Sequence, residues 1–390
     1  MCLNQARLQT AHELAQQCFT LAQRMPNPAL LQEAHVMLGA TLFYLGEFVS
    51  ARANLETGIT LYKAHRSPSL AFSRVLDPGV VCLATVAWTL WTLGYPDQAL
   101  TRSHEALELA QQLSHPYSLG FALHFAAEIH QYRREISLVQ KLAEAAIALA
   151  REHGFMRYLG GGMSWRGWAL AEQGRAEEGI EQLHQGLTTW RTMGGALGLP
   201  YILARLAEAQ GKGGQVEAGL RALDEAFVIV QQYGECHYQA ELHHLKGELL
   251  LRRSAESRAA SLPAPEVEAC FGQALATARY QHAKSLELRA AMSLGRLWQT
   301  QGKHAEARRL LAESYGWFTE GFDTPDCNYP GRLRSPVQSA LLHFGRREKR
   351  VPLKGIPDGL KDIFGMLTSG GKIPANATEL LGTLQRAKPA

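Results

Sequence analysis

The sequence predicts an all-α solenoid of stacked helix pairs, on the strength of three observations. Small residues recur at fixed intervals, 40 residues apart in the middle of the chain and 48 at either end: Gly39, Ala87, Ala127, Gly167, Ala207, Gly247 and Gly295. Leu and Ala dominate the composition, and Val and Ile rarely alternate with polar residues, a composition typical of helices. A second small or turn-forming residue follows most of these positions after seven residues. Self-similarity of this length is the signature of a solenoid.

Each repeat unit reads as two helices joined by a tight turn. Seven positions after the recurring small residue, the chain has Gly46, Gly94, Arg134, Gly174, Gly214 and Gly302. A glycine here ends the first helix because it tolerates the left-handed conformation. Five residues after this position comes another small residue or Val, and seven residues after that comes a further small residue. These pairs are Ala51 and Gly58, Ala99 and Ala106, Val139 and Ala146, Gly179 and Gly186, Gly219 and Ala226, and Ala307 and Ser314. We expect these positions to lie where the two helices cross, with large apolar residues between them filling the core.

The same spacing predicts the domain boundaries. Counted backwards, it makes residues 1–24 half a repeat, a second helix over 4–23 whose partner is missing, so that the chain starts within a repeat. The solenoid proper covers 25–324, with insertions after the first repeat and inside the sixth, where the equivalent pair is Val267 and Ala274. Residues 325–390 contain Pro, Gly and basic clusters without the repeat spacing, and form a poorly specified tail.

Composition restricts the classes of partner and the compartment. The net charge is +4, divided into +7 from residue 331 onward and −3 before it, which argues against a nucleic-acid partner for the solenoid. The basic tail lacks interleaved aromatic residues, so a solvated segment is preferred to a nucleic-acid or lipid-binding arm. Six scattered cysteines and no apolar leader indicate a cytoplasmic protein. The uncharged stretch 80–95 is shorter than a membrane span and keeps the repeat spacing, so we expect a buried helix and no membrane contact.

Three positions of each unit, which in the first repeat are Gly39 (preceded by Leu38), Ala51 and Gly58, have a spacing that resembles the tetratricopeptide repeat (TPR). The unit departs from that family in length, 40 residues in place of 34. Segments such as 77–83, 93–100, 166–174, 240–250 and 315–324 are similar to the C-terminal TPR region of bacterial proteins that combine a class III adenylate or guanylate cyclase domain with an AAA ATPase. The resemblance implies a right-handed superhelix of about seven helix pairs. It carries over no catalytic residue, because none of these motifs belongs to the cyclase or ATPase domains.

We find no convincing chemical motif. The stretch 365–373 is a near miss to a phosphate-binding loop, with the wrong glycine spacing and Ile after Lys372. Cys236, His237, His243 and His244 could be drawn as a metal site, but their spacing favours ordinary helix histidines. We therefore expect no enzymatic activity, no cofactor and no metal.

The candidate binding surface is the concave one, which the TPR resemblance assigns to the first helix of each pair. Its predicted partner-binding residues are Trp88, Trp91, Phe121, His124, Glu128, Tyr132, Trp168, Glu172, Tyr201, Glu208, Lys212, Glu248 and Arg252. Aromatic rings beside acids suit a peptide that carries apolar anchors and basic residues. For Trp88 and Trp91 an alternative stays open, in which they fill gaps between adjacent repeats.

The predicted function is that of a non-catalytic interaction scaffold, the regulatory arm of a bacterial signalling ATPase or cyclase system. Its partner would be a protein, a peptide or the ATPase or cyclase domain itself. There are two alternatives. The first is a solenoid that senses a small molecule. The second is a fragment of a cyclase–ATPase protein that is credited with the activity of the whole protein.

Overall fold

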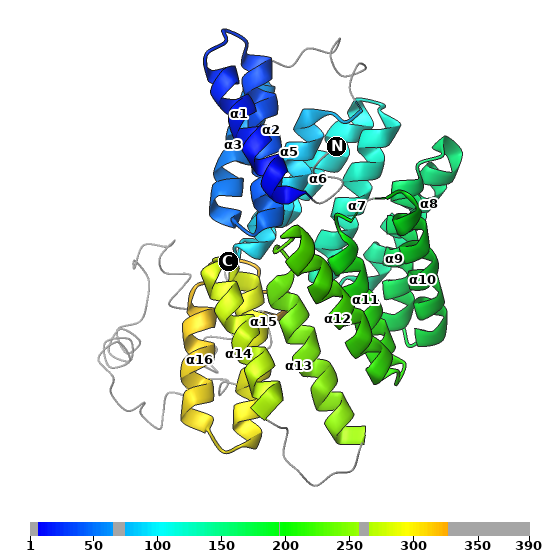
Figure 1. Cartoon of the computed structure of the whole chain (residues 1–390), viewed down its shortest axis with the longest axis vertical. Coiled ribbons are helices and arrows are strands. Elements are labelled where there is room, and N and C mark those ends of the chain that lie inside the picture. The colour runs from blue at the N-terminus through cyan, green and yellow to red at the C-terminus, as the bar shows by residue number, and fades with distance from the viewer. Residues whose placement is uncertain (1–6, 65–74, 195, 257–264, 327–390) are drawn as a thin grey trace, which may run out of the picture. The chain divides into compact units, whose positions relative to one another are not determined.

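The computed structural model describes residues 7–64, 75–194, 196–256 and 265–326, and within them every regular element is a helix. Seven consecutive pairs follow a first helix, α1 (Leu8–Gln23), which packs on α2 (Figure 1). The pairs are α2 (Pro28–Leu45) with α3 (Phe48–Ala64), α5 (Pro78–Thr92) with α6 (Pro96–Gln112), α7 (Pro116–Tyr132) with α8 (Ile136–His153), α9 (Met156–Glu172) with α10 (Ala176–Thr192), α11 (Leu199–Lys212) with α12 (Val216–Tyr233), α13 (Gln239–Glu256) with α14 (Pro265–Tyr280), and α15 (Lys284–Thr300) with α16 (His304–Gly316). The predicted all-α superhelix of seven helix pairs is confirmed.

Local sequence signals explain where the helices begin and end. Proline occupies the first or second position of six helices, where its missing N–H costs no hydrogen bond. The side chains of Asn27 and Asp77 accept hydrogen bonds from backbone N–H groups of α2 and α5. The glycines predicted to end the first helices do so with positive φ, 83° at Gly46 for example, and Arg134 adopts the same conformation at 56°.

The two stretches to which we assigned insertions lie largely within 65–74 and 257–264, outside the described residues, as do the near-miss phosphate loop and nearly all of the tail. The apolar stretch 80–95 is a buried helix, α5, as predicted. In the described part of the chain, no helix is both long and apolar enough to cross a membrane.

Glycine permits the close crossing of α9 and α10. A Cβ atom on Gly167 would lie 2.6 Å from the carbonyl oxygen of Gly179 and 3.0 Å from the backbone nitrogen of Leu183. Both neighbours are backbone atoms of α10, so they cannot move aside as a flexible side chain would. The small size of Gly167 therefore sets the distance between α9 and α10.

Within residues 7–321 the superhelix returns on itself, so that the last helix pair contacts the second (Figure 1). The Ser285 hydroxyl of α15 donates to the carbonyl of Trp91 at 2.6 Å, and Arg289 donates to the carbonyl of Tyr132 at 2.9 Å. After α16, the Glu320 carboxylate accepts hydrogen bonds from the backbone N–H groups of Asp97 and Gln98, both at 3.0 Å. These contacts join segments about 150 to 220 residues apart.

Glu320 caps a helix that has no cap of its own. The residue before α6 is Tyr95, whose side chain makes no capping hydrogen bond. The first N–H groups of a helix lack partners within it, and a carboxylate there also interacts favourably with the helix dipole.

We predict that Gly167→Ala destabilises the protein by about 1–3 kcal/mol, because the added methyl overpacks the α9–α10 crossing. Urea unfolding followed by circular dichroism measures this change. The matched control is Gly272→Ala in α14, where a Cβ would meet nothing within 4 Å. There the lower helix propensity of glycine predicts a gain of up to about 1 kcal/mol. Equal effects at both positions would contradict the proposed crossing constraint.

We predict that Glu320→Ala lowers the stability by about 1 kcal/mol and speeds hydrogen exchange at the amides of Asp97 and Gln98, which lose their acceptor. Amide hydrogen exchange by NMR or mass spectrometry measures the effect. Glu313→Ala is the control, because its contact with Arg279 is a surface pair at 3.8 Å that contributes little. Unchanged exchange at these two amides would mean that the contact does not form in solution.

Candidate functional site

The return of the superhelix turns part of the predicted concave surface into an inner core. Among the thirteen predicted partner-binding residues, the structure buries Trp88, Trp91, Glu128, Tyr132, Trp168 and Tyr201. It half-buries Phe121, His124, Glu172, Glu208, Lys212 and Glu248, and exposes Arg252. The two tryptophans of α5 are 4% and 3% exposed, which favours the packing alternative for them in this structure. Contact of the set with a partner stays a prediction.

The aromatic half of the predicted set comes together through hydrogen bonds and ring stacking. The Trp88 indole donates to the hydroxyl of Tyr132 at 2.9 Å, and that hydroxyl donates to Glu128 at 2.9 Å. Trp91 stacks on Tyr132 with ring centroids 3.8 Å apart. The Tyr201 hydroxyl donates to the Gln131 side chain of α7 at 3.1 Å. Polar atoms of these buried aromatic side chains thus find partners on their own helix or on helices of other repeats.

The second half of the predicted set forms a separate ladder of polar contacts. Trp168 donates to Glu208 at 2.9 Å, and Lys212 pairs with Glu172 and, at 3.9 Å, with Glu208. Arg252 donates to the carbonyl of Gly211 at 3.1 Å, in the preceding repeat. The predicted residues therefore do not form one continuous groove: the aromatic residues are interior and the charged ones bridge adjacent repeats.

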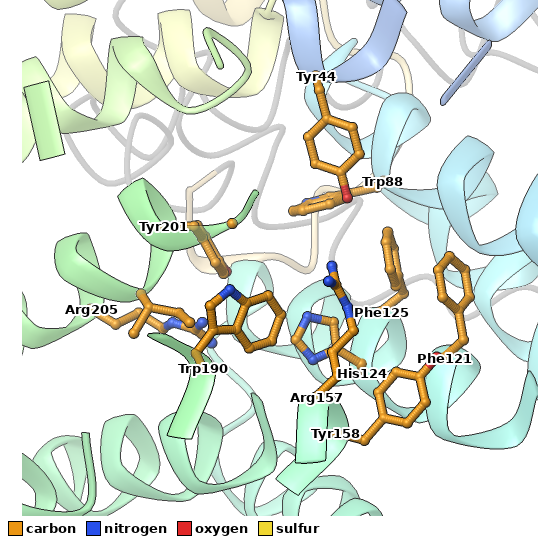
Figure 2. Close-up of a pocket in the computed structure, with 12 residues that line it drawn as sticks. Tyr44, Trp88, Phe121, His124, Phe125, Arg157, Tyr158, Trp190, Tyr201 and Arg205 are labelled. Carbon is orange, nitrogen blue, oxygen red and sulfur yellow. The ribbon is translucent and has the colours of Figure 1, made fainter. Parts of the chain in front are cut away.

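A small cavity lies at the inner side of α5, α7, α9 and α11 (Figure 2). It has a volume of about 30 Å³, room for one or two water molecules. Four of the predicted residues, Trp88, Phe121, His124 and Tyr201, line it. The other lining residues were not predicted, and they are Tyr44, Phe125, Arg157, Tyr158, Trp190, Gly198, Ile202 and Arg205.

Arg205 is the most unusual side chain at this cavity. It is 1% exposed, and its guanidinium stacks on Trp165 at 3.6 Å and on Tyr201 at 4.3 Å from the ring centroids. Within the described part of the chain, none of its three side-chain nitrogens has a hydrogen-bond partner. Stacking offsets part of the cost of burying this cation, but it satisfies none of the five N–H donors.

Among the described residues, two buried acids of this core, Glu128 and Glu235, form no ion pair with Arg205. Burial raises the pKa of Glu128 well above its ordinary value, and one oxygen of this carboxyl has no hydrogen-bond partner among the described residues. Burial also raises the pKa of Glu235 to about 8, while both of its oxygens accept from the N–H of Gly198 at 3.0 Å. His124 stays neutral, because burial and two nearby arginines lower its pKa well below the usual value. The cavity is lined by two guanidinium groups, those of Arg157 and Arg205, and burial lowers the pKa of Arg205 from its usual value.

Sequence signals existed for part of what was missed. Arg205 interrupts the apolar run 199–207, and a lone cation in such a run can mark a polar group in the core. It stands one position from the helix register assigned to the concave face. Trp190 belongs to α10, the second helix of its pair, so a rule restricted to first helices could not find it. Its indole donates to the carbonyl of Leu197 at 3.1 Å, which fixes the ring beside the cavity.

A second buried cluster centres on His244 of α13. Burial alone would lower its pKa, but the carboxylates of Glu241 and Glu248 outweigh burial and raise it to about 9. Burial would likewise raise the pKa of Glu241, but His244 and Arg289 lower it to about 2. Ser293 completes the cluster with a hydrogen bond to His244 at 2.9 Å. The cluster is an internal ion pair that ties α13 to α15.

Two further findings concern ligands. In the described residues, no three His, Cys, Asp or Glu side chains are grouped so that they could hold a metal ion. A larger cavity of about 330 Å³ lies between α3, α5 and α6, lined among others by Tyr62, Lys63, Glu105 and Glu108.

We predict that the stability contributed by His244 is present below pH 6.5 and is lost as the pH rises through about 9, because the raised pKa belongs to the folded state. The stability difference between the wild type and His244→Gln should therefore shrink over this range by the order of 1–3 kcal/mol. Urea unfolding at pH 6 and pH 9.5 measures it. A difference that is independent of pH would contradict a charged His244 in the folded protein.

Comparisons with known proteins agree with this architecture. A tetratricopeptide repeat model matches residues 288–315, in α15 and α16. No match is found among the curated proteins.

Two solved Rap structures are similar in fold to most of this chain. A Rap protein complexed with Competence and Sporulation Factor aligns with a TM-score of 0.53 at 10% identity, covering 89% of this chain and 96% of that one. The Rap conjugation gene regulator of plasmid pLS20, in complex with the Phr* peptide, gives 0.53 at 10% identity, covering 78% and 76%. Yeast Tom70 gives 0.41 at 13% identity, covering 89% and 60%. The chain therefore contains a tetratricopeptide-like helix pair at α15 and α16, and its superhelical fold is similar to that of the two Rap structures.

Proposed function

We propose that this chain is a non-catalytic binding module that holds a peptide or protein segment at the inner face of its superhelix. The observation that carries the proposal is the inner cavity, where four predicted concave residues meet an arginine without hydrogen-bond partners in the described structure. Two Rap structures of the same fold are complexes, one with Competence and Sporulation Factor and one with the Phr* peptide. They support the proposal by likeness of fold alone.

The accessible rim of the cavity suits an extended partner. Phe121 and Arg157 are half-buried, and the Arg157 guanidinium lies over the Trp190 ring at 4.5 Å from its centroid. Aromatic rings and arginines dominate the binding energy of protein interfaces. The cavity itself holds only about 30 Å³, far below the 300–1,000 Å³ typical of small-molecule pockets. A partner therefore inserts one group here and binds mainly outside.

We further propose that the module works in the cytoplasm as the regulatory arm of a bacterial ATPase or cyclase signalling system. The support is the resemblance of segments such as 93–100 and 166–174 to the TPR region of those proteins. The four cysteines within the described residues are free thiols, which suits a reducing compartment.

A small-molecule sensor is the second candidate function, and the cavity of about 330 Å³ between α3, α5 and α6 favours it, because that volume fits a small ligand. A thermal-shift screen of nucleotides, sugars and peptides separates the two functions. Stabilisation by a sugar or nucleotide, and by no peptide, would favour the sensor.

We predict that peptides selected against the full chain from a display library lose at least fivefold in affinity when Phe121 or Arg157 is replaced by Ala, because both side chains border the cavity. Isothermal titration calorimetry measures the dissociation constants. Arg175→Ala is the matched control, since Arg175 is exposed in the turn after α9, at the far end of that helix from Arg157. Affinities that both rim variants leave unchanged would exclude the inner face as the binding site.

A further inference from the structure

The inner cavity is lined by a buried cation, Arg205, whose side chain has no hydrogen-bond partner among the described residues. A guanidinium offers five N–H donors, yet every side-chain nitrogen of Arg205 lacks a hydrogen-bond partner in the described residues. Burying a charge costs free energy unless it is paired and hydrogen-bonded. Figure 2 shows this side chain entering the cluster of rings from α11, with its guanidinium beside Tyr201.

Arg289 shows what a structural arginine looks like in the same core. It is 4% exposed, donates to the carbonyl of Tyr132 at 2.9 Å, and lies 3.6 Å from a carboxylate oxygen of Glu241. Both arginines also stack on aromatic rings, Arg289 on Trp91 and Arg205 on Trp165. Stacking is thus common to the two, and the missing acceptor distinguishes Arg205.

Glu128 is the nearest candidate for an internal counter-ion, and its charge interacts with that of Arg205, but the two side chains are not in contact. Among the described residues, the ion pairs within 4.0 Å do not include Glu128 with Arg205. Its Oε1 accepts from Tyr132, while its Oε2 has no described partner. The space around Arg205 therefore lacks an anion that contacts the guanidinium.

The size and charge of the cavity restrict the chemical groups that it can bind. About 30 Å³ accommodates one or two atoms of the size of a water oxygen, which fits the two oxygens of a carboxylate better than the larger phosphate or sulfate. A guanidinium binds a carboxylate through two parallel hydrogen bonds. Arg157, which also lines the cavity, adds a second positive charge, and the surrounding rings provide apolar surface for the atoms that carry the carboxylate.

We propose that the cavity is a carboxylate site, in which Arg205 binds a carboxylate borne on an apolar or aromatic group of the partner and Arg157 attracts it at the rim. This inference rests on the proposed binding function and names the chemistry recognised. The carboxylate has two sources in a peptide, the C-terminus or an acidic side chain, and both present the same two oxygens to Arg205.

The experiment measures binding of small probes to the full chain by ligand-observed NMR and tryptophan fluorescence. N-acetyl-L-phenylalanine carries a terminal carboxylate, and N-acetyl-L-phenylalaninamide is its uncharged analogue. N-acetyl-L-isoglutamine carries only a side-chain carboxylate. We expect at least one acid to bind at least tenfold more tightly than the neutral amide, and the better acid identifies the source. Equal binding of all three probes, or no binding of either acid, would overturn the proposal without use of any variant.

Arg205→Met tests the residue itself, because methionine keeps an apolar chain of similar length without the charge. We expect it to lower the affinity for the bound acid at least tenfold. Because the substitution removes an unpaired buried cation, we also expect the melting temperature of the ligand-free protein to be equal or higher. Arg166→Met is the matched control on α9, where the guanidinium donates to the Gln182 side chain at 3.1 Å, and its binding should match the wild type. Binding retained within twofold in Arg205→Met would assign the carboxylate to another site.

Failure of this inference and failure of the proposed function give different results. If selected peptides bind but the acids do not, the module binds peptides without a carboxylate site. If an acid binds through Arg205 but no peptide does, the site stands and the peptide-binding function falls.

Discussion

The hydrogen bonds that connect the seventh helix pair to the second and third are the constraint on which the inner structure depends. Ser285 and Arg289 of α15 donate to the carbonyls of Trp91 and Tyr132. Trp91 is the second-to-last residue of α5, and Tyr132 is the last residue of α7. In an ordinary solenoid each repeat contacts only its neighbours, and the first helices border an open groove. Here the ends of α5 and α7 are held against α15, so the rings between them become a core and lose their exposure.

Such a core must accommodate the polar atoms that an open groove would leave in water. Most are paired across repeats: Trp88 with Tyr132, Tyr201 with Gln131, and His244 with Ser293. The pairing explains why so many charged and polar groups can be buried without large cost, since a buried polar group is penalised mainly when it is unsatisfied. Arg205 departs from this rule at all three of its side-chain nitrogens, although a carboxyl, that of Glu128, lies in the same core.

The sequence predicts the repeat because each small residue reports a contact between neighbouring helices. Gly167 is small because the backbone of α10 lies against it, so a 40-residue spacing of such positions counts the helix pairs. Contacts between distant repeats leave no such periodic trace. Nothing near Asp97 in the sequence indicates that Glu320 caps its helix. For the same reason the register rule placed Trp88 and Tyr201 on the inner side but could not foresee that they would be buried there, and it passed over Trp190 on a second helix.

The site and the closure of the superhelix share helices and side chains. Trp88 lines the cavity and lies one turn from Trp91, whose carbonyl receives the hydrogen bond from Ser285. Tyr132 connects both regions, because its hydroxyl accepts from Trp88 while its carbonyl accepts from Arg289. A group that enters the cavity contacts Trp88, which is hydrogen-bonded to Tyr132, the residue whose carbonyl accepts from Arg289 of α15. Linkage then requires that a partner with higher affinity for the closed superhelix stabilises the closure, and that a partner with higher affinity for an opened one weakens it by the same free energy.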